Sequence, residues 1–220
     1  MFTGLVAARG VLAAREPRGP GARLSLSAAF DDGPFTLGES IAVDGVCLSV
    51  DAITKTGFEA DASAETLART TLGALAPGAI LHLERSLRAG SLMGGHLVTG
   101  HVDGVGTLVS RTPVGEAVAM VFRMPPDLAR FVAEKGSIAV DGVSLTVNAV
   151  RDAVDGKDAT NATSARSGPN APQTEHAFSV MLIPHTLAKT KLGALGPGDP
   201  VNLEVDLVAR YVARLMPAER

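Results

Sequence analysis

The chain has 220 residues, 46% of them hydrophobic and 20% charged, a composition typical of a soluble globular protein with one large domain or two smaller ones. A formal net charge of −3 leaves no basic surface for a polyanion, so we expect no nucleic-acid partner. The single cysteine, Cys47, excludes an intramolecular disulfide, and the chain shows neither a secretory signal nor an apolar stretch of membrane-spanning length. These features predict a cytoplasmic protein that does not enter a membrane.

Short apolar or alternating runs follow one another along the chain, separated by turns rich in Gly, Pro and Asp. In the first half we expect strands at residues 5–6, 23–29, 40–43, 46–53, 58–62 and 80–83. Asp44-Gly45 and Asp141-Gly142 lie between apolar runs, which is typical of a hairpin turn in which glycine adopts a positive φ. Each half also favours one short helix, at residues 64–72 and 186–192. This spacing predicts an all-β protein made of barrels or sandwiches.

The two halves of the chain resemble each other. Residues 40–50 (SIAVDGVCLSV) match residues 137–147 (SIAVDGVSLTV) at nine of eleven positions. Two further matches occur in the same order, residues 65–78 with 185–198 and, more weakly, residues 2–6 with 98–102. Ordered matches of this kind indicate a tandem duplication.

The separation between matching segments grows from 96 residues at the first match to 120 at the last, which locates an insertion in the second copy. Residues 152–175 fill it with small and polar residues, so we expect a mobile loop, and a loop without function is the simpler interpretation. Residues 88–95, with three glycines, suit a linker. The expected domains are residues 1–97, residues 98–205 and a terminal helical segment, residues 206–220.

The terminal segment has an apolar stripe with helical spacing between residues 206 and 216. The stripe consists of Leu207, Val208, Tyr211, Val212 and Leu215. Such a helix needs a surface to pack on, which is either its own barrel or a neighbouring subunit. Because the first copy has no equivalent helix, we favour a role in oligomerisation.

Several of these segments resemble the α-type riboflavin synthases along nearly the whole chain. The resemblance rests on residues 1–4 (MFTG), residues 95–102 (GHLVTGHV), both IAVDGV segments and residues 183–186 (IPHT). Any one of these motifs is weak, but together and in order they are specific. Only the insertion lies clearly outside the family pattern.

The resemblance implies a fold of two tandem six-stranded Greek-key barrels plus a C-terminal helix, assembled as a homotrimer. It also implies the final step of riboflavin biosynthesis, in which two molecules of 6,7-dimethyl-8-ribityllumazine react by transfer of a four-carbon unit. The products are riboflavin and 5-amino-6-(D-ribitylamino)uracil, and no cofactor or metal is needed. Catalysis would occur where the first barrel of one subunit faces the second barrel of its neighbour. Whether the protein also associates with lumazine synthase is left open.

Matching positions of the two copies carry the neutral donors and acceptors that a pyrimidinedione and a ribityl chain require. By resemblance, the first site contains Gly4, Leu5, Val6, Cys47, Leu48, Ser49, Asp61, Ala62, Ser63, Ala64, Glu65 and Thr66. The second contains Gly100, His101, Val102, Lys135, Ser144, Leu145, Thr146, Met181, Leu182, Ile183, Pro184, His185 and Thr186. Glu65 and His185 occupy matching positions, and either could contact the ribityl hydroxyls.

We consider His101, Cys47 and Ser40 the catalytic candidates. His101 stands where the first copy has Leu5, and its imidazole would serve as a proton shuttle or orient the acceptor, or else be a structural hydrogen-bonding group. Cys47 pairs with Ser144 in the repeat and would act as a nucleophile or only line the pocket. Ser40 would orient a catalytic water or satisfy backbone groups.

Other polar residues of these motifs have simpler interpretations. We expect His96 to be structural, and Asp44 and Asp141 to shape their turns.

A non-catalytic lumazine- or flavin-binding protein of the same fold is the main alternative. Such proteins keep the barrels but lose polar ligand residues from one copy. Here both copies retain their Thr-Gly, Asp-Gly and Leu-Ser or Leu-Thr elements, which favours the enzyme. A purely structural β-barrel module would leave these matching polar positions unexplained.

Overall fold

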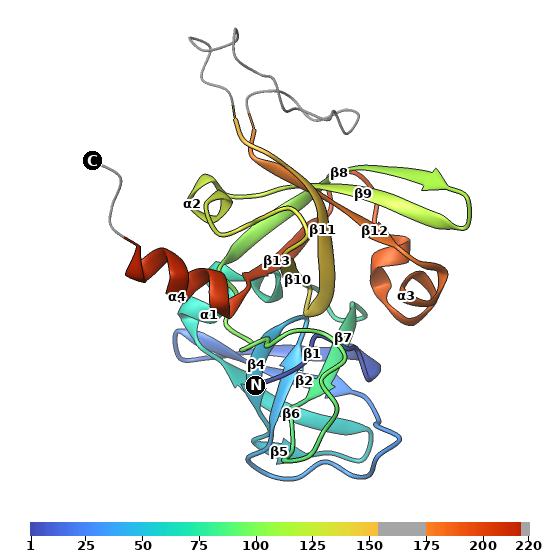
Figure 1. Cartoon of the computed structure of the whole chain (residues 1–220). Coiled ribbons are helices and arrows are strands. Elements are labelled where there is room, and N and C mark those ends of the chain that lie inside the picture. Colours follow the sequence, from blue (N-terminus) through green and yellow to red (C-terminus); the bar gives the residue numbers. More distant parts are fainter. Residues whose placement is uncertain (154–174, 217–220) are drawn as a thin grey trace, which may run out of the picture.

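A computed structural model describes residues 1–153 and 175–216. The chain forms two β domains stacked on each other, the first built from residues 8–85 and the second from residues 104–205 (Figure 1). Most of the sequence insertion, residues 154–174, lies outside the described residues. No helix in the described ranges is long and apolar enough to cross a bilayer.

The first domain is a seven-stranded antiparallel sheet in the order β4-β3-β7-β1-β2-β6-β5. Its strands are β1 (Ala8–Arg18), β2 (Gly21–Ser27), β3 (Ser40–Val43), β4 (Val46–Ser49), β5 (Ala52–Ile53), β6 (Gly57–Ala62) and β7 (Ile80–Arg85). The two edge strands, β4 and β5, are consecutive in the chain and separated only by Val50 and Asp51. The sheet therefore curls until its edges meet, with the Asp51 N–H donating to the Glu59 carbonyl at 2.8 Å.

The second domain is a closed barrel in the order β10-β11-β12-β9-β8-β13. Its strands are β8 (Gly104–Val114), β9 (Ala117–Arg123), β10 (Ser137–Val140), β11 (Val143–Arg151), β12 (Ala177–Leu182) and β13 (Pro200–Val205). β9 pairs with β12 rather than with β10, which is the crossing connection of a Greek key. β11 is one continuous strand where the first copy has β4 and β5, so one barrel closes fully and the other remains a curled sheet.

Each domain has its own hydrophobic core. It is formed by the inward-facing side chains, which alternate with outward-facing ones along each strand. In β2, every second side chain is buried, as expected for a strand with one face on a core. Phe58 is fully buried in the first core, and Phe122 stacks on Phe178 in the second, with ring centroids 5.5 Å apart. Fully burying a phenylalanine of this kind contributes about 1.5–3 kcal/mol.

Both expected hairpin turns are present, and their tips meet between the domains. Asp44 and Gly45 have φ values of 47° and 80°, and Asp141 and Gly142 have 46° and 77°, as in a two-residue turn of type I′. A Cβ atom on Gly45 would lie 2.8 Å from the Gly142 nitrogen, and one on Gly142 would lie 2.7 Å from the Gly45 nitrogen. Glycine is required at both positions because the two backbones touch.

The expected helices are confirmed, but each is broken in two. The helical segments are α1 (Ala64–Arg69), η1 (Thr71–Gly73), α2 (Pro126–Ala129), α3 (Pro184–Lys189), η2 (Lys191–Ala194) and α4 (Leu207–Leu215). The breaks fall at Thr70 and Thr190, which are extended. The Thr70 hydroxyl donates to the Thr66 carbonyl at 2.7 Å and accepts from the Leu72 N–H at 3.3 Å, so the side chain replaces the helical hydrogen bonds lost at the break.

Candidate ligand-binding sites

The segment that precedes each barrel lies against the other barrel. The Ser144 N–H of β11 donates to the Gly4 carbonyl at 2.8 Å, and the Cys47 N–H of β4 donates to the Gly100 carbonyl at 2.9 Å. Val6 packs on the core of the second domain and Val102 on the core of the first. Each candidate site is therefore built from both halves of the chain.

Two buried glutamates hold these crossing segments in place. Glu84 of β7 accepts from the Thr3 N–H and hydroxyl, both at 2.6 Å, and from the Gly4 N–H at 3.0 Å. Glu204 of β13 accepts in the same way from Thr99 (2.6 and 2.8 Å) and from the Gly100 N–H (3.0 Å). Burial raises the pKa of both glutamates, whereas these hydrogen bonds oppose the shift by stabilising the ionised carboxylate.

The crossing requires glycine at one position of each segment. Gly4 and Gly100 have φ values of 75° and 83°. A Cβ atom on Gly4 would lie 2.5 Å from the Ser144 Cβ, and one on Gly100 would lie 2.6 Å from the Cys47 Cβ. Phe2 and Val98 then pair as a short antiparallel bridge with N···O distances of 2.7 and 3.1 Å, which ties the two segments together.

This arrangement differs from the expected grouping of the site residues. Residues 4–6 were grouped with the first copy and residues 100–102 with the second, but the structure exchanges them. Residues 100–102 lie against β4, the strand that holds Cys47, Leu48 and Ser49 of the first expected site. Residues 4–6 lie against β11, the strand that holds Ser144, Leu145 and Thr146 of the second. The reason is that the two repeated N-terminal segments pack across the domain junction rather than on the barrel that follows them.

The expected site residues divide into outward and inward side chains. Half-buried or exposed positions include Cys47, Ser49, Asp61, Ser63, Ala64, Glu65, Thr66, Leu5, His101, Ser144, Thr146, Met181, Ile183, Pro184, His185 and Thr186. Leu48, Ala62, Leu145 and Leu182 instead belong to the barrel cores. These four residues can offer a ligand only their backbone groups.

The first site is the more acidic one. Asp61 at the end of β6 accepts from the Arg23 Nε at 2.8 Å and pairs with the Arg18 Nε at 3.2 Å. The hydrogen bond from Arg23 is the main reason why the pKa of Asp61 is lowered, so its carboxylate is ionised at neutral pH. Ser63 caps α1, with its hydroxyl accepting from the Thr66 N–H at 3.1 Å, and Glu65 lies in the first turn of the helix.

The second site has lost these carboxylates and gained basic groups. Met181 and His185 stand where the first copy has Asp61 and Glu65. Lys135 adopts a φ of 66° and donates its N–H to the Val147 carbonyl at 2.8 Å. The matching residue of the first copy is Gly38, with a φ of 78°, so the second copy places a long cationic side chain in a conformation that glycine adopts more easily. The two sites therefore differ in charge although their backbones match.

The side chains of all three catalytic candidates, Cys47 included, make no hydrogen bond among the described residues. The His101 backbone donates to the Thr99 hydroxyl at 3.3 Å, while its exposed imidazole makes no hydrogen bond within residues 1–153 and 175–216. Ser40 lies opposite Ser49 in the β3–β4 pair, and its hydroxyl is likewise without a partner among the described residues. No hydrogen bond joins Ser40 and His101 among the described residues.

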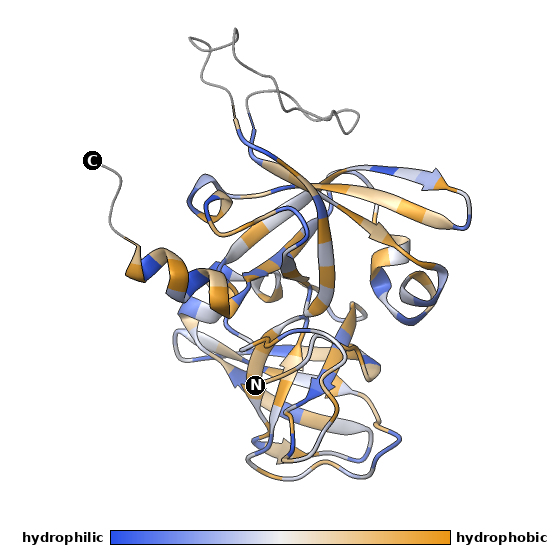
Figure 2. Cartoon of the chain, in the orientation of Figure 1, coloured by the Kyte–Doolittle hydropathy of each residue, from blue (hydrophilic) through white to orange (hydrophobic). Residues whose placement is uncertain are grey.

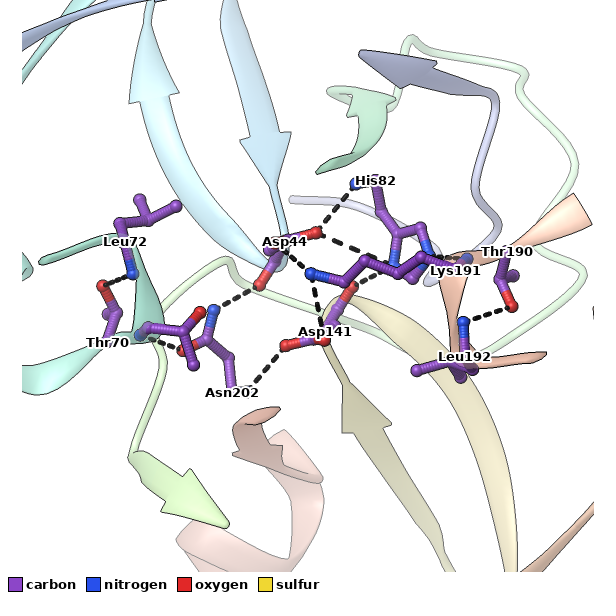
Figure 3. A network of polar contacts seen from close by, with 10 residues as sticks. Asp44, Thr70, Leu72, His82, Asp141, Thr190, Lys191, Leu192 and Asn202 are labelled. Atoms are coloured by element: carbon purple, nitrogen blue, oxygen red, sulfur yellow. Dashed lines mark hydrogen bonds and ion pairs between the residues drawn. The ribbon is translucent and has the colours of Figure 1, made fainter. Parts of the chain in front are cut away.

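A polar network between the domains was not anticipated (Figure 3). The Lys191 ammonium lies between the carboxylates of Asp44 and Asp141, hydrogen-bonded to the first and 3.2 Å from the second. Asp44 and Asp141 shape their turns as expected, and they also join the two barrels. Burial raises the pKa of Asp44 to about 7, although the nearby Lys191 charge favours its ionised form.

His82 of β7 completes this network as a neutral imidazole. Its Nε2 atom accepts from the Lys191 N–H at 2.7 Å, so its proton is on Nδ1, which donates to the Asp141 carbonyl at 2.9 Å. Burial lowers the pKa of His82 to about 4. Asn202 of β13 donates to the Asp44 carbonyl at 2.9 Å and accepts from the Thr71 N–H at 2.8 Å. Contacts of this kind fix how the two barrels, and with them the two sites, are oriented.

The buried network and the two glutamates were missed for a simple reason. Residues 80–85 (ILHLER) and 200–205 (PVNLEV) place Glu84 and Glu204 at the same repeat position, and a longer alignment of the two copies would have found this signal. His82 and Asn202 also match in position, but they differ in residue type. Sequence similarity therefore does not show that they have equivalent roles.

A separate open cavity of about 710 Å³ lies at the far end of the first domain, beside Phe30, Phe35 and Lys55. None of the expected site residues lines it.

Comparison with known proteins agrees with the duplicated architecture. The lumazine binding domain model matches residues 3–86 and 99–206. The riboflavin synthase of Mycobacterium tuberculosis is 45% identical over 217 residues, covering 98% of both chains. That of Brucella abortus is 42% identical over 220 residues, again covering 98% of both chains, and that of Bacillus subtilis is 33% identical over 98% of this chain and 90% of its own.

Two solved structures share the fold. LumP complexed with riboflavin aligns with a TM-score of 0.74 at 22% identity, covering 93% of this chain and 99% of its own. LumP complexed with 6,7-dimethyl-8-(1'-D-ribityl) lumazine gives 0.73 at 21% identity and the same coverage. At such identity the likeness concerns the fold alone. The two matched domains and the near-full-length identity to curated relatives show that the chain belongs to the riboflavin synthase family.

Proposed function

We propose that this protein is a riboflavin synthase that converts two molecules of 6,7-dimethyl-8-ribityllumazine into riboflavin and 5-amino-6-(D-ribitylamino)uracil. The observation that carries the proposal is the pair of matching sites. One is built on the strand that contains Cys47 and the other on the strand that contains Ser144, and each is completed by a segment of the other half of the chain. One chain thus offers two places for the same heterocycle, which is what a reaction between two identical molecules needs.

The chemistry requires little beyond orientation and proton transfer. The donor molecule loses a proton from its 7-methyl group, and its ring system delocalises the resulting negative charge. Holding two reactants in near-attack geometry contributes about 7–11 kcal/mol to lowering the barrier. His101, with its free imidazole in the first site, is our candidate for the proton transfer, while Cys47 and Ser40 line the same site.

The two sites of one chain face different directions. Helices α1 and α3, each bordering one site, lie on opposite sides of the molecule (Figure 1). Two ligands bound to the same chain would therefore be held apart, and transfer would occur between the first site of one chain and the second site of another. This arrangement favours a homo-oligomer, and we propose a homotrimer.

The terminal helix supplies a surface for this assembly. Hydrophobic residues recur along α4 (Figure 2), and Val208, Tyr211 and Leu215 are 62%, 62% and 82% exposed. Its polar side is anchored to its own chain, since Arg210 donates to both oxygens of Asp103 at 2.8 Å. The apolar stripe is thus turned away from the barrels, where a second copy of the chain would cover it.

Turnover of the purified protein tests the proposal. Protein freed of small molecules is mixed with 6,7-dimethyl-8-ribityllumazine, and riboflavin should appear at half the rate at which the lumazine disappears. Tight binding without turnover would support a chromophore-binding protein, the alternative suggested by the likeness to LumP. We place the reaction in the cytoplasm, where Cys47 would remain reduced, and co-sedimentation with lumazine synthase tests an association with that enzyme.

A further inference from the structure

A histidine of the interdomain linker lies directly against the second site. His96 donates its backbone N–H to the Thr3 carbonyl at 3.1 Å, and its Nδ1 atom is 2.7 Å from the Ser144 hydroxyl. A Cβ atom on the preceding Gly95 would collide with the Thr3 carbonyl and lie 3.0 Å from the Ser144 Oγ. The linker therefore packs tightly enough to hold the imidazole in a fixed position.

The other ring nitrogen determines which way this hydrogen bond runs. His96 Nε2 is buried and has no hydrogen-bond partner among the described residues. A buried N–H without an acceptor is rarer in proteins than a buried acceptor without a donor. The proton of the neutral ring is therefore placed on Nδ1, which donates to the Ser144 Oγ. Burial lowers the pKa of His96, although Asp206 opposes the shift, so the neutral ring is favoured.

The direction of this bond sets the role of Ser144. Because its oxygen accepts from His96, the hydroxyl proton is available to a group outside this pair. Ser144 is half-buried and lies next to Gly4, inside the second site.

The first site has no equivalent of the His96–Ser144 hydrogen bond among the described residues. Cys47 occupies the matching position, and its thiol makes no hydrogen bond within the described part of the chain. A thiol is also a weak donor. The difference has a topological cause: the linker containing His96 follows β7, whereas β13 is followed directly by α4.

We propose that His96 is a positioning residue that fixes the Ser144 hydroxyl as a hydrogen-bond donor to an acceptor atom of the ligand in the second site. The acceptor is a carbonyl oxygen or an unprotonated ring nitrogen of the heterocycle. This inference rests on the proposed function, since it assumes that the second site binds a ribityllumazine. It makes the two sites of one chain unequal in hydrogen bonding as well as in charge.

Titration of the full-length protein with 6,7-dimethyl-8-ribityllumazine tests this role. We expect two binding phases in this titration, one for each site of the chain. The phase that Ser144→Ala weakens identifies the second site. His96→Leu should weaken the same phase about three- to tenfold, the effect of one hydrogen bond, and leave the other phase unchanged. His96→Asn should restore most of the affinity because its amide can donate in place of Nδ1. In the Ser144→Ala background, His96→Leu should have no further effect. His176→Asn is the matched control, since His176 lies just before β12 and pairs with Asp152 at 3.2 Å.

A measurement on the unmodified protein does not depend on the folding of any variant. The ¹⁵N chemical shifts of the His96 ring should identify the neutral form protonated on Nδ1, and a ring protonated on Nε2 overturns the proposal. Equal weakening of both phases by His96→Leu, or an effect that persists without the Ser144 hydroxyl, overturns it as well. The proposed function fails separately, if the unmodified protein neither binds two lumazines per chain nor forms riboflavin.

Discussion

His82 and Asn202 make the same pair of hydrogen bonds in opposite directions across the junction between the barrels. Each side chain donates to the carbonyl of the hairpin aspartate of the other half, at 2.9 Å in both cases. Each also accepts a backbone N–H from the other half, at 2.7 Å from Lys191 and 2.8 Å from Thr71. An imidazole and an amide can replace each other here because each offers at least one donor and one acceptor.

This equivalence predicts that His82→Asn keeps the fold but changes how stability depends on pH. The pKa of a histidine is about 6.5 in an unfolded chain, and burial lowers that of His82 to about 4. Between these values the unfolded state binds a proton that the folded state does not, so this contribution to stability is lost as pH falls from about 6.5 to 4. Between pH 7 and pH 5, the free energy of unfolding of His82→Asn should therefore fall by about 2 kcal/mol less than that of the unmodified protein.

Urea unfolding at pH 7 and pH 5 measures this difference. The raised pKa of Asp44 acts in the opposite direction, lowering stability as pH rises from about 4 to 7, but it is common to both proteins and is removed by the comparison. Parallel pH profiles for the two proteins would show that His82 does not titrate as described.

Replacing Lys191 should destabilise the junction strongly. Asp44 and Asp141 are 0% and 1% exposed, and Lys191 supplies the positive charge between them. Lys191→Thr copies the residue that the first half has at Thr71 and leaves two buried carboxylates without a cation. We expect a loss of about 3 kcal/mol in the free energy of unfolding, measured by urea denaturation at pH 7. Lys189→Thr, at an exposed position of α3, should change it by less than about 0.5 kcal/mol.

The exchange of the N-terminal segments predicts which site each glycine serves. Gly4→Ala would force a methyl group onto Ser144 at a positive φ, and Gly100→Ala would do the same to Cys47. We expect the first change to weaken lumazine binding at the second site and the second change to weaken it at the first, each with a stability loss of about 2–3 kcal/mol.

A two-phase ligand titration distinguishes the two variants. Gly19→Ala serves as the control, since Gly19 also has a positive φ but no atom within 4 Å of its Cβ position. If Gly4→Ala affects the same binding phase as Cys47→Ala, the assignment of residues 4–6 to the second site is wrong.

His101 should matter for the rate more than for binding. Its exposed imidazole is free to transfer a proton, so His101→Ala should lower kcat by about 10²- to 10⁴-fold with little change in lumazine affinity. Steady-state kinetics combined with equilibrium titration separates the two effects. An unchanged kcat would reduce His101 to a structural residue, and His176→Ala should leave both quantities unaltered.

The apolar stripe of α4 should control assembly. Leu215→Glu places a charge at a side chain that is 82% exposed, and we expect the oligomer to dissociate and turnover to fall at low protein concentration. Sedimentation velocity measures the change in mass. Arg214→Glu, next to it but off the stripe, alters the charge more and should leave the assembly intact; dissociation of both variants alike would remove the stripe's role.

The repeats predicted the all-β architecture, the hairpin turns and the terminal helix, because each leaves a local pattern in the sequence. β1 was missed: Ala8–Arg18 is rich in Ala and Arg, which favour strands weakly, and its conformation is imposed by pairing with β2 and β7. The exchange of residues 4–6 and 100–102 was also beyond prediction. Similarity between two copies says which residues match, but not which of two similar domains a terminal segment packs on.

The crossing arms also say something about ancestry. Each half is completed by an N-terminal segment of the other half. Gly4 of one segment donates to Glu84 in the same way as Gly100 of the other donates to Glu204. A single-copy ancestor with this architecture would have been a symmetric dimer that swapped its N-terminal arms. Duplication of its gene and fusion of the two copies would let the halves diverge, so that Asp61 in one site corresponds to Met181 in the other and the Cys47 thiol corresponds to the Ser144 hydroxyl.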